Sequence, residues 1–219
     1  MRRSQMARQG LQSFFLVALI LASCSAPGSD NPAEGCGGLE ATVSCLEIVR
    51  IAPTSSNIDA FQTLCVDPNT GTVTAEPFTD DNALVILANM QFPTAQAGFD
   101  IRVIGYSVSY RLNQCPAAAL GCPPLTGFTV SGQSIFIPQG QSVAVTLPFV
   151  PLRVKNEFCA SGGQRVGAIP SYTATYTFTA QTTRFNDTFT VTGSAQFTIG
   201  DFDSGFSCSG IPSLASCRP

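Results

Sequence analysis

Strict alternation of apolar and polar residues over two neighbouring segments is the feature that most constrains how this chain can fold. Within 171–180 and within 187–199, aromatic or aliphatic residues alternate with threonine, serine and glutamine. Successive side chains of a β-strand point to opposite faces, so each segment is predicted to be a strand with one buried and one solvated face. Residues 184–187 are expected to join them as a hairpin. The predicted buried residues are Tyr172, Ala174, Tyr176 and Phe178, then Phe189, Val191, Ala195, Phe197 and Ile199.

Further strands are predicted on either side of this pair. Residues 102–112 alternate in the same way, with Ile104, Tyr106, Val108, Tyr110 and Leu112 assigned to the core. Residues 82–92 are apolar on both faces, which favours a central strand whose outer side is partly covered. The remaining predicted strands are 44–51, 127–137 and 142–150, with weaker ones at 60–65 and 72–76 across a turn at 67–71. No helical stripe of useful length is evident. About seven short antiparallel strands predict an all-β, two-sheet sandwich.

The N-terminus has the layout of an export signal. Arg2, Arg3 and Arg8 precede the apolar run 14–22, which is too short to cross about 30 Å of hydrocarbon as a helix. Residues 1–23 are therefore predicted to be a signal peptide.

The end of that run, Leu21-Ala22-Ser23-Cys24, resembles the lipobox of bacterial lipoproteins. The resemblance implies that Cys24 carries a diacylglyceride, becomes the new N-terminus and receives a further acyl chain such as palmitate. Two or three acyl chains are enough for stable membrane anchoring. Ser25 implies sorting to the outer membrane. The alternative is an ordinary signal peptide cut nearby, with Cys24 unmodified.

The cysteine count is consistent with the lipid anchor. The chain has 9 cysteines, and removing Cys24 leaves an even number for disulfides in an oxidising compartment. These disulfide candidates are Cys36, Cys45, Cys65, Cys115, Cys122, Cys159, Cys208 and Cys217. The shortest loop suggests Cys115–Cys122. Proximity also suggests Cys36–Cys45 and Cys208–Cys217, which would leave Cys65–Cys159 as a long-range disulfide.

The mature chain divides by composition. Residues 24–42 are predicted to be the lipidated cysteine and a flexible tether, 43–203 the β-sandwich domain, and 204–219 a Cys-containing C-terminal tail. The order of 105–110, 142–151 and 199–203 resembles the immunoglobulin-like or fibronectin-III-like sandwich of bacterial lipoproteins. That resemblance covers roughly 78–203 and implies a fold, with no activity attached.

Composition excludes several classes of function. The chain has no histidine, which removes Ser-His-Asp and Cys-His catalysis and histidine-ligated metals. A net charge of −3 without a basic run argues against nucleic-acid binding. Cysteines lack the close pairs typical of metal clusters. No cofactor is expected.

Other candidate chemistry is weak. Ser134 and Ser207 lack the final glycine of a nucleophile elbow, and Lys155, the only lysine, is predicted to lie solvated in a loop. The loop acids Asp80, Asp81, Asp100, Glu157, Asp187, Asp201 and Asp203 offer no spacing that singles out a catalytic pair. Asp201 and Asp203, with Asp80 or Asp81, are weak calcium candidates. The four tyrosines are assigned to the core, with each hydroxyl bonded at its rim.

The threonine-rich faces are the remaining functional signal. Because they carry little charge, they suit a flat interaction surface, although threonine is also simply a good strand former. We therefore expect a non-enzymatic, lipid-anchored envelope protein that serves as a structural or protein-interaction module, with a protein partner in the envelope. The competing class is a glycan- or calcium-binding domain that uses loop carboxylates.

Overall fold

The computed structural model describes residues 45–90, 99–117, 122–163, 169–184, 186, 188–202, 206–209 and 211–217. Within these ranges the chain is mostly β, with eleven strands and one short helix, where about seven strands were expected. The elements are β1 (Cys45–Pro53), β2 (Asn57–Asp59), β3 (Gln62–Val66), β4 (Val73–Ala75), β5 (Asp81–Met90), β6 (Ile101–Gln114), β7 (Phe128–Ile137), β8 (Ser142–Val150), α1 (Leu152–Ala160), β9 (Ser171–Thr182), β10 (Thr188–Gly200) and β11 (Ser213–Ser216).

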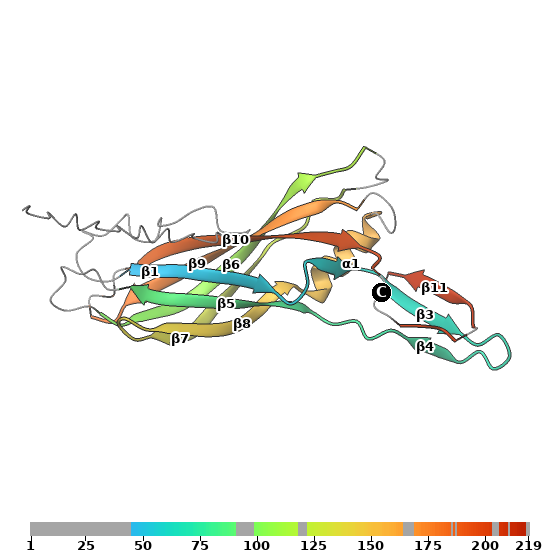
Figure 1. The fold of residues 1–219 in the computed structure, drawn as a ribbon, viewed down its shortest axis with the longest axis horizontal. Helices are drawn as coiled ribbons and strands as arrows, with labels where there is room; N and C mark the ends of the chain where they lie inside the picture. The colour runs from blue at the N-terminus through green and yellow to red at the C-terminus, as the bar shows by residue number, and fades with distance from the viewer. Residues whose placement is uncertain are drawn as a thin grey trace, which may run out of the picture.

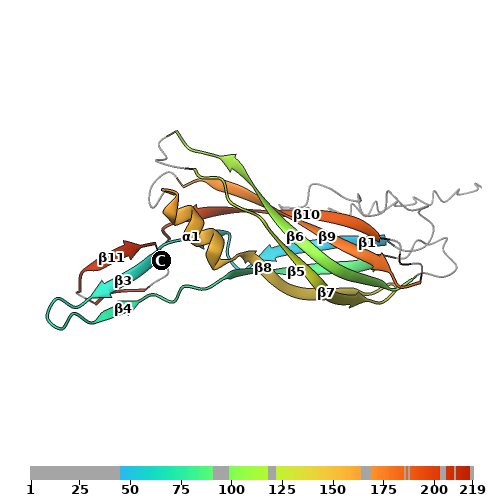
Figure 2. The same ribbon diagram turned by 180° about the vertical axis from the view of Figure 1, so that it is seen from behind.

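The strands form three sheets. One has the order β1-β5-β8, the second β2-β10-β9-β6-β7 and the third β11-β3-β4. The first two run along the long axis of the molecule and enclose the core, while the third projects from one end, with α1 close to the junction (Figures 1 and 2). Neighbouring strands are antiparallel except β2, which is parallel to β10. This arrangement brings β2, α1 and the start of β5 together at one end of the core.

The period-two prediction for the core is confirmed in β9 and β10. Tyr172, Ala174, Tyr176 and Phe178 are fully buried, and the predicted inward residues of β10 are buried apart from Phe189, which packs partly exposed. Tyrosine hydroxyls find carbonyl partners, as expected for buried phenols: Tyr172 donates to Pro123 at 2.7 Å and Tyr176 to Pro148 at 2.7 Å.

The predicted face of β6 is correct over only part of the strand. Val103 and Gly105, assigned to the solvated side, are buried, whereas Ile104 is half-exposed and Leu112 is exposed. The register with both neighbours shifts between Val103 and Gly105, which marks a β-bulge at Ile104. One extra residue reverses the alternation, so Ile101 and Val103 face inward before the bulge and Tyr106 and Val108 after it.

The helix α1 was missed by the sequence reading. It buries Val154, Lys155, Phe158 and Cys159 on one face, and its first residue follows Pro151, which has no side-chain cap of its own. The missing cap comes from Asp80, whose Oδ1 accepts a hydrogen bond from the Leu152 N–H at 2.7 Å. Because the capping residue lies 72 residues away in the chain, the residues just before the helix contain no capping motif that a sequence pattern could detect.

Two of the proposed disulfides are wrong. The structure contains Cys115–Cys122, as predicted, but pairs Cys65 with Cys208 and Cys159 with Cys217 in place of Cys65–Cys159 and Cys208–Cys217. β11 pairs with β3, which carries the C-terminal segment back beside Cys65. That strand pairing sets which thiols meet. Cys45 is also disulfide-bonded, while its predicted partner Cys36 lies outside the described residues.

The predicted signal peptide, Cys24 and the tether also lie outside the described residues. Among those that are described, no helix combines the length and the hydropathy needed to span a bilayer.

Candidate functional site

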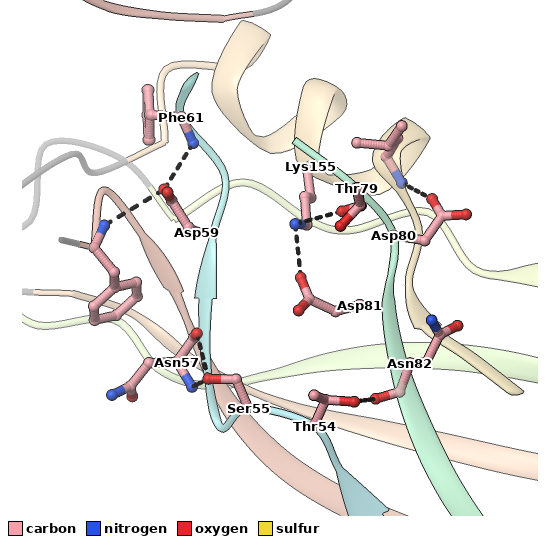
Figure 3. Close-up of polar contacts among 12 residues, drawn as sticks. Thr54, Ser55, Asn57, Asp59, Phe61, Thr79, Asp80, Asp81, Asn82 and Lys155 are labelled. Carbon is pink, nitrogen blue, oxygen red and sulfur yellow. Dashed lines mark hydrogen bonds and ion pairs between the residues drawn. The ribbon is translucent and has the colours of Figure 1, made fainter. Parts of the chain in front are cut away.

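A cleft opens where the sandwich meets α1 and the small sheet. It has a volume of about 440 Å³ and is lined by residues from β2, from the segment between β4 and β5, from α1 and from the end of β10: Ser55, Asn57, Asp59, Glu76, Pro77, Phe78, Thr79, Asp81, Lys155 and Phe202. This volume falls within the roughly 300–1,000 Å³ of small-molecule sites. Figure 3 shows several of its polar side chains, with Asp59 on one wall and Lys155 and Asp81 on the other.

Lys155 is a buried cation of the cleft, and the expectation that it lies solvated in a loop is wrong. It is 5% exposed and sits on α1. Its Nζ lies 2.7 Å from Asp81 Oδ2, donates to the Thr79 carbonyl at 2.8 Å and stands 4.8 Å from the centre of the Phe78 ring (Figure 3). A buried ammonium needs such partners, since an unpaired charge in the interior is very costly.

Asp80 and Asp81, which were expected to complete a calcium site with Asp201 and Asp203, have other partners. Asp80 caps α1, and Asp81 pairs with Lys155. Asp201 is described next to β10, but Asp203 lies outside the described residues. Across the described ranges there is no group of three or more His, Cys, Asp or Glu side chains arranged to hold a metal ion.

Asp59 and Glu76 are the two acids of the cleft that the sequence reading did not single out. Glu76 is 4% exposed and accepts a hydrogen bond from the Thr63 N–H at 3.1 Å. Asp59 Oδ1 accepts from the Phe61 and Phe202 N–H groups at 3.1 and 3.4 Å. The pKa of Asp59 is raised from 3.8 to about 6, mainly by burial and in part by the negative charges of Glu76 and Asp201, against the lowering effect of the backbone donors.

The lysine and the serine of the cleft are both engaged by neighbouring groups. The ammonium of Lys155 forms an ion pair with Asp81 and donates a hydrogen bond to the Thr79 carbonyl, so these two neighbours hold it in place. Ser55, the one serine in the lining, donates to the Asn57 carbonyl at 2.7 Å. The acceptors left to contact a ligand in the cavity include the carboxylates of Asp59 and Glu76.

A second candidate surface is the outer face of the five-stranded sheet. Three successive cross-strand rows over β10, β9, β6 and β7 consist of threonine and serine with Gly105 as the single exception. We call the following residues the hydroxyl face: Thr190, Thr179 and Ser131; Thr192, Thr177, Ser107 and Thr129; Ser194, Thr175 and Ser109. The residues on β9 are half-buried by their neighbours, whereas Thr190, Ser109, Thr129 and Ser131 are exposed.

The next row of this sheet adds larger side chains. Arg102 pairs across the strands with Phe136 on one side and Gln181 on the other, and Phe136 is 47% exposed. At the opposite end of the face, Thr173 pairs with Arg111 and is itself buried, which the prediction of a solvated threonine row did not anticipate.

Other predicted candidates are scattered. Ser134 lies on β7 and Ser207 follows β10, far apart in the sheet order. Asp100 accepts a hydrogen bond from the Gln139 N–H, and Glu157 accepts from the Thr126 hydroxyl. Asp187 lies outside the described residues.

No family model matches this chain, and no curated protein is similar to it in sequence. The cleft was not predictable because its walls come from residues 55–81, 155 and 202. One signal was available for the helix that carries Lys155: Pro151 before it and Gly162-Gly163 after it are typical helix boundaries.

Proposed function

We propose that this protein is a lipid-anchored component of a bacterial cell envelope, where it acts as a non-catalytic structural or protein-interaction module. Cys24 in its lipobox-like context would hold it in the membrane, and Ser25 favours the outer membrane. The disulfides described above fit an oxidising compartment. No nucleic acid and no cofactor is part of this proposal.

We propose an immunoglobulin-like topology for the domain. In its favour, the order β10-β9-β6-β7 corresponds to strands G-F-C-C′ of that fold, and β1-β5-β8 to A-B-E. β2 would be the short A′ strand that runs parallel to G. The hairpin β3–β4 and the helix α1 would then be insertions in loops of the sandwich.

The hydroxyl face is the observation that carries the interaction role. Its ten side chains include no ionised group, so a partner could cover them without the large desolvation cost of buried charges. At its margin, Arg102 is of a residue type that often dominates binding energy, and the exposed Phe136 is of a type enriched at interfaces. A protein partner on this face is the use that this chemistry supports best.

Site-specific photocrosslinking in membranes tests the interaction role. A photoreactive residue at Thr177 or Thr192 is expected to capture a discrete protein, and Phe136→Ala is expected to reduce the yield. The matched control is Thr146, exposed on the outer face of the other sheet. Equal labelling from Thr146, or a chain that captures no neighbour from either threonine, would refute the interaction surface.

The anchor is tested separately. Cys24→Ser is expected to release the protein from the membrane fraction, because acylation would no longer be possible. Mass spectrometry of the N-terminal peptide of the parent should show an acylated Cys24. Membrane retention of the variant, or an unmodified peptide, would contradict the anchor.

A second candidate function is a domain that binds a ligand through loop carboxylates, with a glycan or calcium as the ligand. The acid-lined cleft favours this alternative. Calcium is the weaker of the two ligands, because the described carboxylates do not gather as a compact set of oxygen ligands.

A further inference from the structure

We propose that the cleft binds an organic cation, a guanidinium or primary ammonium group, between Asp59, Glu76 and the rings of Phe78 and Phe202. This inference rests on the second candidate function and is independent of the hydroxyl face. It names a ligand class that differs from both calcium and a neutral glycan.

The charge balance of the lining is the first argument. Lys155 and Asp81 neutralise each other at 2.7 Å, which leaves Asp59 and Glu76 as the uncompensated charges of the lining. Both receive hydrogen bonds from neutral backbone N–H groups. Burial is the main effect that raises the pKa of Asp59, and the negative charges of Glu76 and Asp201 add to it. A bound cation would supply the positive charge that this wall lacks.

The hydrogen-bonding capacity of the cleft leads to the same ligand class. Ser55 donates to Asn57, and Lys155 donates to Thr79 and pairs with Asp81. Among the described residues, no donor lies on Asp59 Oδ2 or on Glu76 Oε1, so a complementary ligand would bring N–H groups to these two oxygens. Guanidinium and ammonium groups are pure donors, with five and three N–H bonds respectively.

The aromatic residues supply the third argument. Phe78 already has the Lys155 ammonium 4.8 Å from its ring centre, so the ring is placed where a positive charge is favoured. Phe202 is the second ring in the lining, and its own N–H holds Asp59. Apolar walls beside carboxylates suit a cation with an alkyl stem.

Size separates an organic cation from a metal ion. Calcium draws six to eight oxygens to about 2.3–2.6 Å, and the described residues contain no group of acids set out in that way. Asp59 stands on β2 and Glu76 follows β4, within a cavity of about 440 Å³. An alkylguanidinium or alkylammonium group can span such a space, whereas a bare ion would remain underligated.

Calorimetry on the full-length, disulfide-intact protein in detergent tests the proposal. The probes are capped Gly-Arg-Gly, its neutral citrulline analogue, glucosamine, glucose and calcium chloride. The arginine peptide is expected to bind at pH 7.5 and the citrulline peptide is not. Stronger binding of glucosamine than of the arginine peptide would indicate that the natural ligand is a small amine. Stronger binding of the arginine peptide would indicate a basic side chain of a partner. Equal binding of arginine and citrulline, of glucosamine and glucose, or binding of calcium alone would overturn the proposal.

Variants locate the binding. Asp59→Asn and Glu76→Gln keep an acceptor for the backbone donors and remove the charge, and each is expected to weaken binding about tenfold. Glu47→Gln, an exposed acid on β1, is the matched control and should bind like the parent. Circular dichroism verifies that each variant is folded. Unchanged affinity in both cleft variants would overturn the proposal.

The pH dependence gives a further readout. Asp59 faces Glu76 and Asp201, with Asp81 and Lys155 across the cleft, and its pKa is raised to about 6. Affinity is therefore expected to fall between pH 7.5 and pH 5 in the parent and to fall less in Asp59→Asn. If cation binding fails while crosslinks from Thr177 persist, the cleft proposal is lost and the interaction role stands. If the crosslinks are lost while cation binding persists, the interaction role is lost and the cleft proposal stands.

Discussion

The buried ion pair between Lys155 and Asp81 should make a large contribution that depends on both partners. Lys155→Met keeps the apolar stem and removes the ammonium, so Asp81 loses its partner at 2.7 Å and the Thr79 carbonyl its donor at 2.8 Å. Removing one member of a buried pair costs about 3–5 kcal/mol. The Asp81 side chain keeps 22% exposure, which allows water to solvate it in part. We therefore expect a loss near the lower end, about 3 kcal/mol in the free energy of unfolding.

A double-mutant cycle isolates the pair. Asp81→Asn leaves an amide oxygen that can still accept from Lys155, so its cost should be smaller, about 1–2 kcal/mol. The double variant should lose less than the sum of the single losses, with a coupling energy of about 1 kcal/mol or more. Arg50→Met, which replaces an exposed cation on β1 whose side chain has no hydrogen bond or ion pair with the described residues, is the control and should change stability by about 0.5 kcal/mol.

The assay is urea unfolding followed by circular dichroism, without reductant, in a Cys24→Ser background. A Lys155→Met variant within about 0.5 kcal/mol of its parent, or a coupling energy near zero, would refute the reasoning. Such a result would mean that the ammonium exchanges its partners for water at little cost.

Three further predictions follow from the same contacts. The pKa of the Asp59 carboxyl is raised from 3.8 to about 6, so the folded state binds this proton more tightly than the unfolded state does. The carboxyl's contribution to stability therefore declines as the pH rises from about 4 to 6. In urea unfolding, the stability of Asp59→Asn relative to the parent should increase across this range, and a constant difference would contradict the prediction. Gly163→Ala should cost about 1–3 kcal/mol, because the added Cβ would lie 2.3 Å from a ring atom of Phe158; thermal melting measures the loss, and an unchanged melting temperature would show that the ring can move away. Replacing both cysteines of the Cys65–Cys208 disulfide, which are 143 residues apart, should cost up to about 5 kcal/mol, against about 2.5 kcal/mol for the 7-residue separation of Cys115–Cys122; denaturant midpoints compare them, and equal losses would argue against the loop-entropy account.

Much of the sandwich could be predicted because its signal is local. The strand at 142–150 matches β8 residue for residue, and β9 pairs with β10 as an antiparallel neighbour, as the predicted hairpin requires. Alternation is a property of a single strand, and it survives wherever one face meets a core and the other meets solvent. The prediction of a central strand over 82–92 is confirmed as far as Met90, since β5 lies between β1 and β8, while 91–92 lie outside the described residues.

The errors arise where distant parts of the chain meet. The bulge at Ile104 reverses the inward face of β6, and no residue type in that segment announces it. Cysteine pairing by proximity failed because β11 returns to β3 and carries Cys208 to Cys65. The short strand β2 was likewise missed, since its partner β10 is about 140 residues further along the chain, as the hydrogen bond from Thr198 to Asn57 shows.

The sequence by itself determined the class of this protein: alternating faces require an all-β core, and the lack of histidine rules out imidazole chemistry. Only the tertiary structure decided which polar groups act together. Asp59, Glu76, Asp81 and Lys155 come from β2, the end of the β3–β4 hairpin, β5 and α1, and each is unremarkable in its own segment. The physical reason is that burial and charge pairing depend on distance in space, whereas strand formation depends on neighbours in the chain. Lys155, which was expected to be solvated, is therefore buried and forms an ion pair with Asp81.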